Sequence, residues 1–205
     1  MAAIYRSFKK ESPDTSHLTV VDGAHNAVAL TFTVNYGFGS GLVVPGTGIL
    51  LNDEMDDFAA APGVPNSYGL VGGEANAVAA GKIPLSSMTP LIATKDGHFF
   101  MTAGAPGGST IITTTLQTLL HVVVYGMDAQ AAVSAPRIHQ QWLPNETRVE
   151  RFGLDEPTRT ALEKRGHMLA VSPRGWGNAM CVVAKPDGSL EGGADPRGEG
   201  VARGL

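Results

Sequence analysis

The sequence reads ESPDTSH at residues 11–17, where a polar arm meets the first β-rich segment. Residues 1–14 show no hydrophobic periodicity and end in a Ser-Pro-Asp turn signal, so we expect an extended or disordered arm. Regular structure is expected to follow, because residues 17–21 are rich in strand-forming residues. A threonine at such a boundary is most often an ordinary surface residue. The rest of the chain must therefore decide whether Thr15 has a chemical role.

Short turn signals divide much of the remaining chain into strand pairs. The connecting clusters read DGAHN, DG and PDG, which are typical of hairpins. The expected pairs are residues 17–21 with 27–34, residues 91–95 with 98–102, and residues 180–185 with 189–191. Cys181, the only cysteine, lies in an apolar run of the last pair. We therefore expect it to be a small core residue.

Helical signals occupy three other segments, at residues 111–125, 128–134 and 155–165. The hydroxyls of Ser109 and Thr110 can cap the first helix, and Gly166 can end the third. Hairpins that alternate with helices predict a layered α+β domain with mainly antiparallel sheets. Residues 59–86 form a long loop rich in Gly, Pro and Asn. Such a loop indicates a lid or binding loop, with disorder as the alternative.

Composition narrows the classes of function. A length of 205 residues with 43% hydrophobic content indicates one domain with a sizeable core. A net charge of -4, with scattered Lys and Arg, argues against nucleic-acid binding. The six dispersed histidines show no metal-ligand spacing, so no metal site is expected. No apolar run approaches the roughly 18 residues that span a bilayer, and no export signal stands at the start.

Ordered motifs downstream change the interpretation of Thr15. They read NDEMDDF at 52–58, PGVPN at 62–66, YGLVGG at 68–73, PLSSM at 84–88, APGGS at 105–109, QWLP at 141–144 and DPR at 195–197. Together with residues 11–17, these motifs resemble the γ-glutamyltranspeptidase family from Glu11 to the C-terminus. Residues 1–10 show no such similarity. So many matches in the same order argue against a chance similarity.

The resemblance implies an N-terminal-nucleophile hydrolase with an αββα sandwich, of which this chain holds the small-subunit half. Residues 1–14 would be a linker, the remnant of the large subunit's tail, and residues 15–205 the catalytic domain. Family precursors cut themselves into two subunits, which implies cleavage between Asp14 and Thr15. Thr15 then becomes the first residue of the small subunit and its nucleophile.

The properties of a threonine hydroxyl fit this chemistry, because it is a weak nucleophile and needs an adjacent base. A free α-amino group has a pKa of about 8 and can act as that base near neutral pH. Cleavage before Thr15 therefore creates the base as it exposes the nucleophile. Before cleavage, the same hydroxyl would attack the carbonyl carbon of Asp14 and give an ester that water opens. The resemblance makes Thr33 the hydroxyl that orients Thr15.

The resemblance also assigns residues to the α-amino group of the γ-glutamyl moiety, namely Asn35, Glu54 and Asp57. Carboxylates suit an ammonium, because charge-assisted hydrogen bonds are strong. Asn35 follows Thr33 by two residues, and strand alternation predicts that both side chains share one face. In the family, the residue that matches Tyr68 closes a lid loop by a hydrogen bond to the counterpart of Asn35. Without the other motifs, the acidic run would be interpreted as a solvated loop.

The remaining assignments concern negative charge on the substrate. Ser86 and Ser87 would bind the α-carboxylate, although either could be a simple turn residue. Gly107 and Gly108 stand before an expected helix, where free N–H groups and the helix dipole favour anions. The resemblance makes these glycines the oxyanion hole, which stabilises the tetrahedral intermediate. Alone, the pair would indicate only a tight turn.

The function implied by the resemblance is γ-glutamyl acyl transfer without a cofactor. Its reactions are hydrolysis of glutathione and other γ-glutamyl amides, or transfer of the γ-glutamyl group to amino acids or peptides. One alternative is a cephalosporin- or glutaryl-type amide acylase, and another is an inactive truncated remnant that serves as a folding or interaction module. The expected partner is a large subunit, from the same precursor or as a separate chain, which supplies an Arg for the α-carboxylate. A periplasmic or extracellular location is expected by resemblance.

Overall fold

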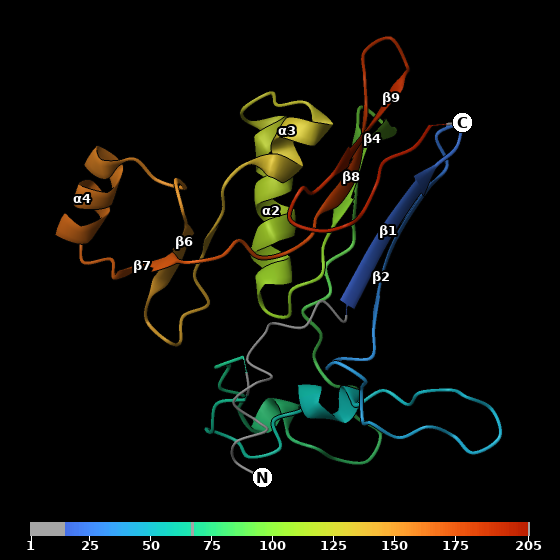
Figure 1. Ribbon diagram of the computed structural model, residues 1–205, viewed down its shortest axis with the longest axis vertical. Helices are drawn as coiled ribbons and strands as arrows, with labels where there is room; N and C mark the ends of the chain where they lie inside the picture. Colours follow the sequence, from blue (N-terminus) through green and yellow to red (C-terminus); the bar gives the residue numbers. More distant parts are fainter. Residues whose placement is uncertain (1–14, 67, 205) are drawn as a thin grey trace.

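The computed structural model of the protein describes residues 15–66 and 68–204. The arm expected at residues 1–14, with the Asp14 side of the expected cleavage site, lies outside the described residues. The described chain forms a layered α+β structure (Figure 1). Within this part of the chain, no helix is long and apolar enough to cross a membrane.

A two-stranded hairpin opens the described chain. Strand β1 (Thr15–Val21) pairs antiparallel with β2 (Ala27–Thr33), so that the first residue of β1 lies opposite the last residue of β2. The Asp22 carboxylate stabilises the connecting turn by accepting hydrogen bonds from the backbone N–H groups of Ala24 and Asn26. Such side-chain bonds to a turn are typical of Asp. The predicted hairpin is confirmed, with β1 beginning two residues earlier than expected.

A four-stranded antiparallel sheet forms the centre of the molecule, in the order β3-β4-β8-β9. Its strands are β3 (Leu91–Lys95), β4 (His98–Gly104), β8 (Met180–Ala184) and β9 (Leu190–Ala194). Asp96 and Gly97, between β3 and β4, both have positive φ, at 53° and 81°. A two-residue hairpin turn of this kind matches the twist of its strands. Both hairpins predicted for this sheet are therefore confirmed.

Helices cover one side of the four-stranded sheet, and the β1–β2 hairpin covers the other (Figure 1). The helices on this side are α2 (Thr110–Val123) and α3 (Ala129–Ser134). A third sheet stands beside α2 and consists of β5 (Ile138–His139), β6 (Thr147–Glu150) and β7 (Leu169–Ser172). Strands β6 and β7 are parallel and are connected through α4 (Glu156–Lys164). This parallel pair departs from the otherwise antiparallel arrangement that the sequence predicts.

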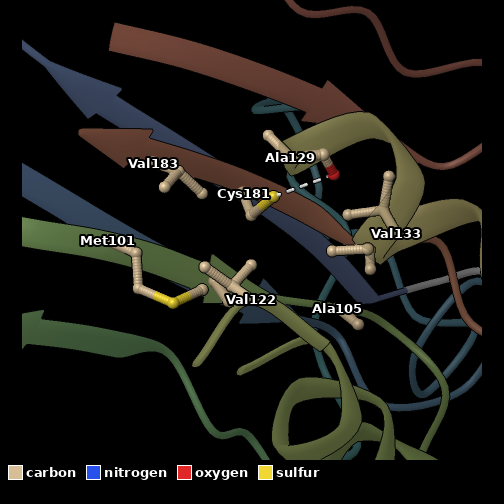
Figure 2. Close-up of a cluster of buried hydrophobic side chains, with 10 residues drawn as sticks. Met101, Ala105, Val122, Ala129, Val133, Cys181 and Val183 are labelled. Atoms are coloured by element: carbon tan, nitrogen blue, oxygen red, sulfur yellow. Dashed lines mark hydrogen bonds between the residues drawn. The ribbon is translucent and has the colours of Figure 1, made fainter. Parts of the chain in front are cut away.

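The buried core lies between the four-stranded sheet and helices α2 and α3 (Figure 2). Its members are small or unbranched, namely Met101, Ala103, Ala105, Val122, Ala129, Ala132, Val133, Ala179, Cys181 and Val183. Cys181 is 1% exposed, and its Sγ lies 3.5 Å from the carbonyl oxygen of Ala129. Burial raises the pKa of its thiol to about 12. The prediction that Cys181 is a small core residue is confirmed.

The helix ends show where local signals succeed and where they fail. Asp128 and Asp155 cap α3 and α4, because each carboxylate accepts a hydrogen bond from a backbone N–H in the first turn. The prediction that Ser109 and Thr110 cap α2 is wrong. Ser109 instead donates to the side chain of Gln141, and Thr110 donates to the carbonyl oxygen of Gly107. Both hydroxyls are therefore used as donors.

Buried charges join the third sheet to the core. The Arg137 guanidinium donates to Asp195 at 2.5 Å and to the carbonyl oxygens of Val133 and Trp176 at 2.6 Å each. Arg197, from the same DPR motif as Asp195, bonds both carboxylate oxygens of Glu150, at 2.8 and 2.6 Å. Each charge thus has a partner of opposite sign, as burial of ions requires.

Candidate active site

The hairpin register brings two hydroxyl groups together at the open end of the β1–β2 hairpin. Thr15 and Thr33 lie opposite each other, and the Thr15 hydroxyl donates to the Thr33 hydroxyl across 3.0 Å. Thr33 Oγ1 also accepts a hydrogen bond from the backbone N–H of Asn35 at 2.9 Å. Both threonines are half-buried. Thr33 can therefore fix the position of the Thr15 hydroxyl.

Asn35 corrects one step of the sequence reasoning. Strand β2 ends at Thr33, and Asn35 has a φ of 72°, so strand alternation does not govern its direction. This left-handed conformation is one that Asn tolerates better than most residues. It turns the chain toward the acidic segment, where Asn35 Nδ2 donates to the carbonyl oxygen of Asp53 at 3.3 Å.

One cavity of about 690 Å³ collects nearly all of the predicted site residues. Its lining includes Thr15, Thr33, Asn35, Glu54, Asp57, Tyr68, Ser86, Ser87 and Gly108. Gly107 precedes Gly108 and is not part of the lining. The acidic residues come from the 3-10 helix η1 (Glu54–Asp57), and a second short helix, η2 (Glu74–Asn76), follows in the long loop. Residues scattered over nearly a hundred positions of sequence thus meet at one cavity.

The electrostatics of the cavity favour a cationic ligand. Burial, followed by the charges of Asp57 and Asp53, raises the pKa of Glu54. Burial, followed by the charges of Asp53 and Asp56, raises the pKa of Asp57. Within the described residues, neither Glu54 nor Asp57 forms an ion pair. A cation bound between them would relieve this repulsion.

The glycine pair before α2 has a backbone that other residues rarely adopt. Gly107 and Gly108 have φ values of 134° and 54°. A Cβ at Gly107 would lie 2.5 Å from Thr110 Oγ1, and one at Gly108 would lie 2.7 Å from Cε1 of Tyr68. Both positions therefore require glycine. The pair stands one residue before α2, at its positive dipole end.

The long loop is ordered around the cavity. The Asn66 side-chain oxygen accepts hydrogen bonds from the backbone N–H groups of Tyr68 and Leu70, at 3.0 Å each. Pro65 and Val71 form an antiparallel bridge, so the described residues of this segment make a compact turn. The Tyr68 ring stacks on Tyr36, with 5.6 Å between centroids and 12° between planes. The interpretation as a binding loop is favoured over disorder, and the hydrogen bond from Tyr68 to Asn35 stays a prediction.

His17 lies directly behind the threonine pair and had no role in the sequence reasoning. Its Nδ1 is 2.8 Å from the hydroxyl of Thr31, its partner across the hairpin. Its ring packs on Gly104, the last residue of β4, where any Cβ would collide with it. Burial lowers the pKa of His17 to about 4, so the imidazole is neutral near pH 7. It fills the space between β1 and β4, the strand that leads to Gly107.

The cavity lining also includes residues that were not predicted to act there. Among them are Ser109, Thr113, His139 and Gln141. The QWLP motif marked Gln141 only as part of the resemblance. His139 carried no sequence signal, because its strand, β5, has only two residues.

Solved structures define the class to which this fold belongs. A crystal structure of a mutant γ-glutamyltranspeptidase of Helicobacter pylori matches with a TM-score of 0.84 and 46% identity, over 89% of this chain and 100% of that chain. Cephalosporin acylase of Bacillus halodurans matches with a TM-score of 0.75 and 28% identity, over 96% of this chain and 36% of that chain. The fold is that of the N-terminal-nucleophile hydrolases.

Sequence comparison gives the family. The family model described as gamma-glutamyltranspeptidase matches residues 3–205. A glutathione hydrolase proenzyme of Escherichia coli (strain K12) is 51% identical over 187 residues, which are 91% of this chain and 32% of that protein. The chain belongs to the γ-glutamyltranspeptidase family. The match begins at residue 3, so the expectation that residues 3–10 lie outside the family is wrong. The chain spans about a third of the length of the curated relatives it matches.

Proposed function

We propose that this chain carries the nucleophile of an enzyme that transfers γ-glutamyl groups to water, amino acids or peptides, with glutathione as one donor. The observation that carries the proposal is the contact between Thr15 and Thr33 at the wall of a cavity that also holds Glu54 and Asp57. The names of the relatives, glutathione hydrolase and γ-glutamyltranspeptidase, support the same reaction. Cleavage between Asp14 and Thr15 is part of the proposal.

The proposed acylation step uses the new N-terminus. The α-amino group of Thr15 accepts the hydroxyl proton as Oγ1 attacks the γ-carbonyl carbon of the donor. Backbone N–H groups of the segment at Gly107 and Gly108 stabilise the resulting oxyanion. The carbon–nitrogen bond then breaks, and the leaving amine takes the proton back from the α-ammonium group. The product is a γ-glutamyl ester of Thr15.

The second half of the reaction releases Thr15. Water or the amine of an acceptor attacks the ester carbonyl, with the same α-amino group accepting its proton. Collapse of the tetrahedral intermediate breaks the bond to Thr15 Oγ1, which recovers its proton. The products are glutamate or a new γ-glutamyl amide. No redox change occurs in either half.

The donor's amino-acid end would bind at the opposite wall of the cavity. Glu54, Asp57 and Asn35 would hold the α-ammonium group, which meets the repelling carboxylates described above. Ser86 and Ser87 line the same cavity and would donate to the α-carboxylate. Tyr68 would cover the bound donor. This arrangement distinguishes a γ-glutamyl group from a glutaryl group, which lacks the ammonium.

Cleavage of matched amides tests this function in a complex reconstituted with a family large subunit. We expect γ-glutamyl p-nitroanilide to be cleaved with a kcat/KM roughly 30-fold or more above that of glutaryl p-nitroanilide, because a buried charged contact is worth about 2–5 kcal/mol. Equal rates would favour an amide acylase of broader specificity. A complex that cleaves neither amide and keeps the bond before Thr15 intact would favour the inactive remnant.

The raised carboxyl pKa values lead to a second expectation, on pH. Binding of an ammonium favours the ionised forms of Glu54 and Asp57, so it releases protons at a pH near their raised pKa values. The affinity advantage of L-glutamate over glutarate should be full above those pKa values. It should be lost as the pH falls through them, beginning above the ordinary carboxyl range of about 4.

Calorimetric titration of the reconstituted complex with both ligands measures this advantage. Ionisation of the Thr15 amino group affects the binding of both ligands equally. Its contribution therefore cancels in the ratio of the two affinities. In Glu54→Gln, the pH dependence of the ratio should weaken. A ratio that stays constant from pH 8 to pH 4 would contradict the ammonium site.

A large-subunit segment is the proposed partner of this chain, supported by an uncovered apolar surface. On the outer face of the β1–β2 hairpin, Leu18 pairs with Leu30 and Val20 with Val28. Val20 and Val28 are 59% and 55% exposed. Contiguous apolar patches of this kind mark interfaces. The relatives are about three times longer than this chain, and a helical layer from the remaining length would complete an αββα sandwich over the hairpin.

The match to the Helicobacter pylori structure supports the same division into two subunits. The chain of the Helicobacter pylori enzyme is matched along its entire length by 89% of this chain. The matched part of this chain therefore equals a whole solved chain, as expected for a separate subunit. In the reconstitution above, activity should appear only when the large subunit is added.

A further inference from the structure

The side-chain amide of Gln141 forms hydrogen bonds on both of its sides. Its Nε2 donates to the backbone carbonyl oxygens of Tyr68, at 2.9 Å, and Leu143, at 3.0 Å. Its Oε1 accepts from the Ser109 hydroxyl at 2.7 Å and lies 2.9 Å from His139 Nε2. Two donors and two acceptor sites are all that an amide has. Gln141 is therefore saturated.

These contacts fix the orientation of the amide. Carbonyl oxygens only accept, so the NH₂ group must face Tyr68 and Leu143. The oxygen then faces His139, which must present an N–H at Nε2. The Thr113 hydroxyl lies 2.8 Å from His139 Nδ1 and can donate to it. The same hydroxyl also lies 3.2 Å from the carbonyl oxygen of Thr110 and can donate there instead. The orientation of the Gln141 amide does not depend on this choice, because the carbonyl oxygens of Tyr68 and Leu143 fix it.

The two sides of Gln141 belong to parts of the cavity that are distant in sequence. On one side, Tyr68 and Gly69 belong to the loop over the cavity, and a Cβ at Gly69 would lie 3.7 Å from Gln141 Nε2. On the other side, Ser109 directly follows Gly108. The Tyr68 ring closes the connection, because it lies against Gly108 from the cavity side. Two contacts thus hold the loop to the glycine segment. One is the Tyr68 ring against Gly108, and the other is the Gln141 amide, which bonds both Tyr68 and Ser109.

We propose that Gln141 is a positioning residue that latches the loop at Tyr68 to the segment of Gly108 and Ser109. The inference rests on the proposed function for its kinetic consequence, since the latch keeps Tyr68 over a bound γ-glutamyl donor. Gln141 touches neither Thr15 nor Glu54 in the hydrogen-bond network described. Its loss should therefore weaken donor binding more than it slows the chemical step.

Gln141→Glu tests the loop side of the latch. The carboxylate keeps an acceptor for Ser109 and His139, but an oxygen replaces the NH₂ group that donates to Tyr68 of the loop and to Leu143, and this oxygen faces two carbonyl oxygens. Gln141→Leu removes every hydrogen bond at similar volume and adds no charge, so it separates latch loss from charge effects. Gln130→Glu is the matched control, because Gln130 Nε2 likewise donates to a backbone carbonyl oxygen, that of Ala194 at 2.8 Å, far from the cavity.

Hydrogen exchange of the full chain measures the latch without any activity. The N–H of Asn66 bonds the carbonyl of Leu70, and the N–H of Gly69 bonds the carbonyl of Asn66, so their exchange reports opening of the loop. Both Gln141 variants should speed exchange there by roughly tenfold, the scale expected for loss of one or two hydrogen bonds. Gln130→Glu should not. Unchanged exchange in both Gln141 variants would overturn the latch.

Kinetics of the reconstituted complex measure its consequence. Both Gln141 variants should raise the KM for γ-glutamyl p-nitroanilide by roughly five- to tenfold, with less than about threefold change in kcat. In a Tyr68→Ala background, neither variant should raise KM further, because the ring that the latch positions is gone. Additive effects in that background would overturn the role in donor binding. A wild-type complex without activity would refute the proposed function, whereas the exchange result would still decide the latch.

Discussion

Thr15→Ala is expected to abolish both cleavage after Asp14 and turnover of γ-glutamyl amides, because one hydroxyl serves both reactions. In the structure this hydroxyl donates to Thr33 at the wall of the cavity. Removal of a nucleophile lowers kcat by roughly 10⁴-fold or more. The two losses should appear together in a complex reconstituted with a family large subunit. Mass spectrometry of the chain measures the first, and release of p-nitroaniline from γ-glutamyl p-nitroanilide measures the second.

Three variants give the gradation that this mechanism requires. Thr15→Ser keeps the hydroxyl and should retain part of both reactions. Thr33→Ala removes the orienting contact at 3.0 Å and should slow both without abolishing them. Thr19→Ala is the control, because Thr19 lies on the same strand but its hydroxyl contacts Thr102 and not the cavity. Turnover by Thr15→Ala at the parent rate would show that another residue is the nucleophile.

Local signals predicted the parts of the fold whose determinants are local. The strands β3 and β4 were predicted from the Asp-Gly pair that separates them. In the structure, Asp96 and Gly97 carry the positive φ values of a two-residue hairpin turn. The helices α3 and α4 begin one residue after their predicted starts, and Asp128 and Asp155 cap them through their own carboxylates. In these elements, a turn or cap residue within a few positions fixes the boundary.

The third sheet was not predicted, because its determinants are distant. Strand β5 has two residues, which carry no periodicity, and β6 and β7 have four each. Strand β6 pairs in parallel with β7 across an intervening helix. The predicted cap at Ser109 was wrong for the same reason, since its hydroxyl bonds a side chain 32 residues away. Propensity within a window cannot register such partners.

The site was predicted from matched motifs and not from spacing. Glu54 and Ser86 come from different turns, and only the fold brings both to the cavity of Thr15. Gln141 was not predicted as a functional residue, because its amide bonds backbone carbonyl groups, whose positions have no sequence signature. Asn35 lines the predicted cavity, but strand alternation does not place it there, because β2 ends at Thr33.

Arg137→Met should produce the largest loss of stability among single changes away from the cavity. Arg137 is 1% exposed, and its removal leaves buried Asp195 without one of its two cationic partners and the carbonyl oxygen of Trp176 without the donor at 2.6 Å. The carbonyl oxygen of Val133 keeps only the longer bond from Arg197, at 3.2 Å. Breaking one side of a buried ion pair costs about 3–5 kcal/mol. Urea unfolding of the full chain measures the change in the free energy of unfolding.

The matched control for Arg137→Met is Lys185→Met, which breaks the exposed pair between Lys185 and Glu191 at 3.7 Å. An exposed pair contributes about 1 kcal/mol or less, because water and salt screen it. Asp195→Asn serves as a second background for Arg137→Met, since it removes the charge that Arg137 compensates. If the pair acts as a unit, Arg137→Met should cost less in the Asp195→Asn background than in the parent chain. Equal costs for Arg137→Met and Lys185→Met would mean that burial does not strengthen the Arg137 pair.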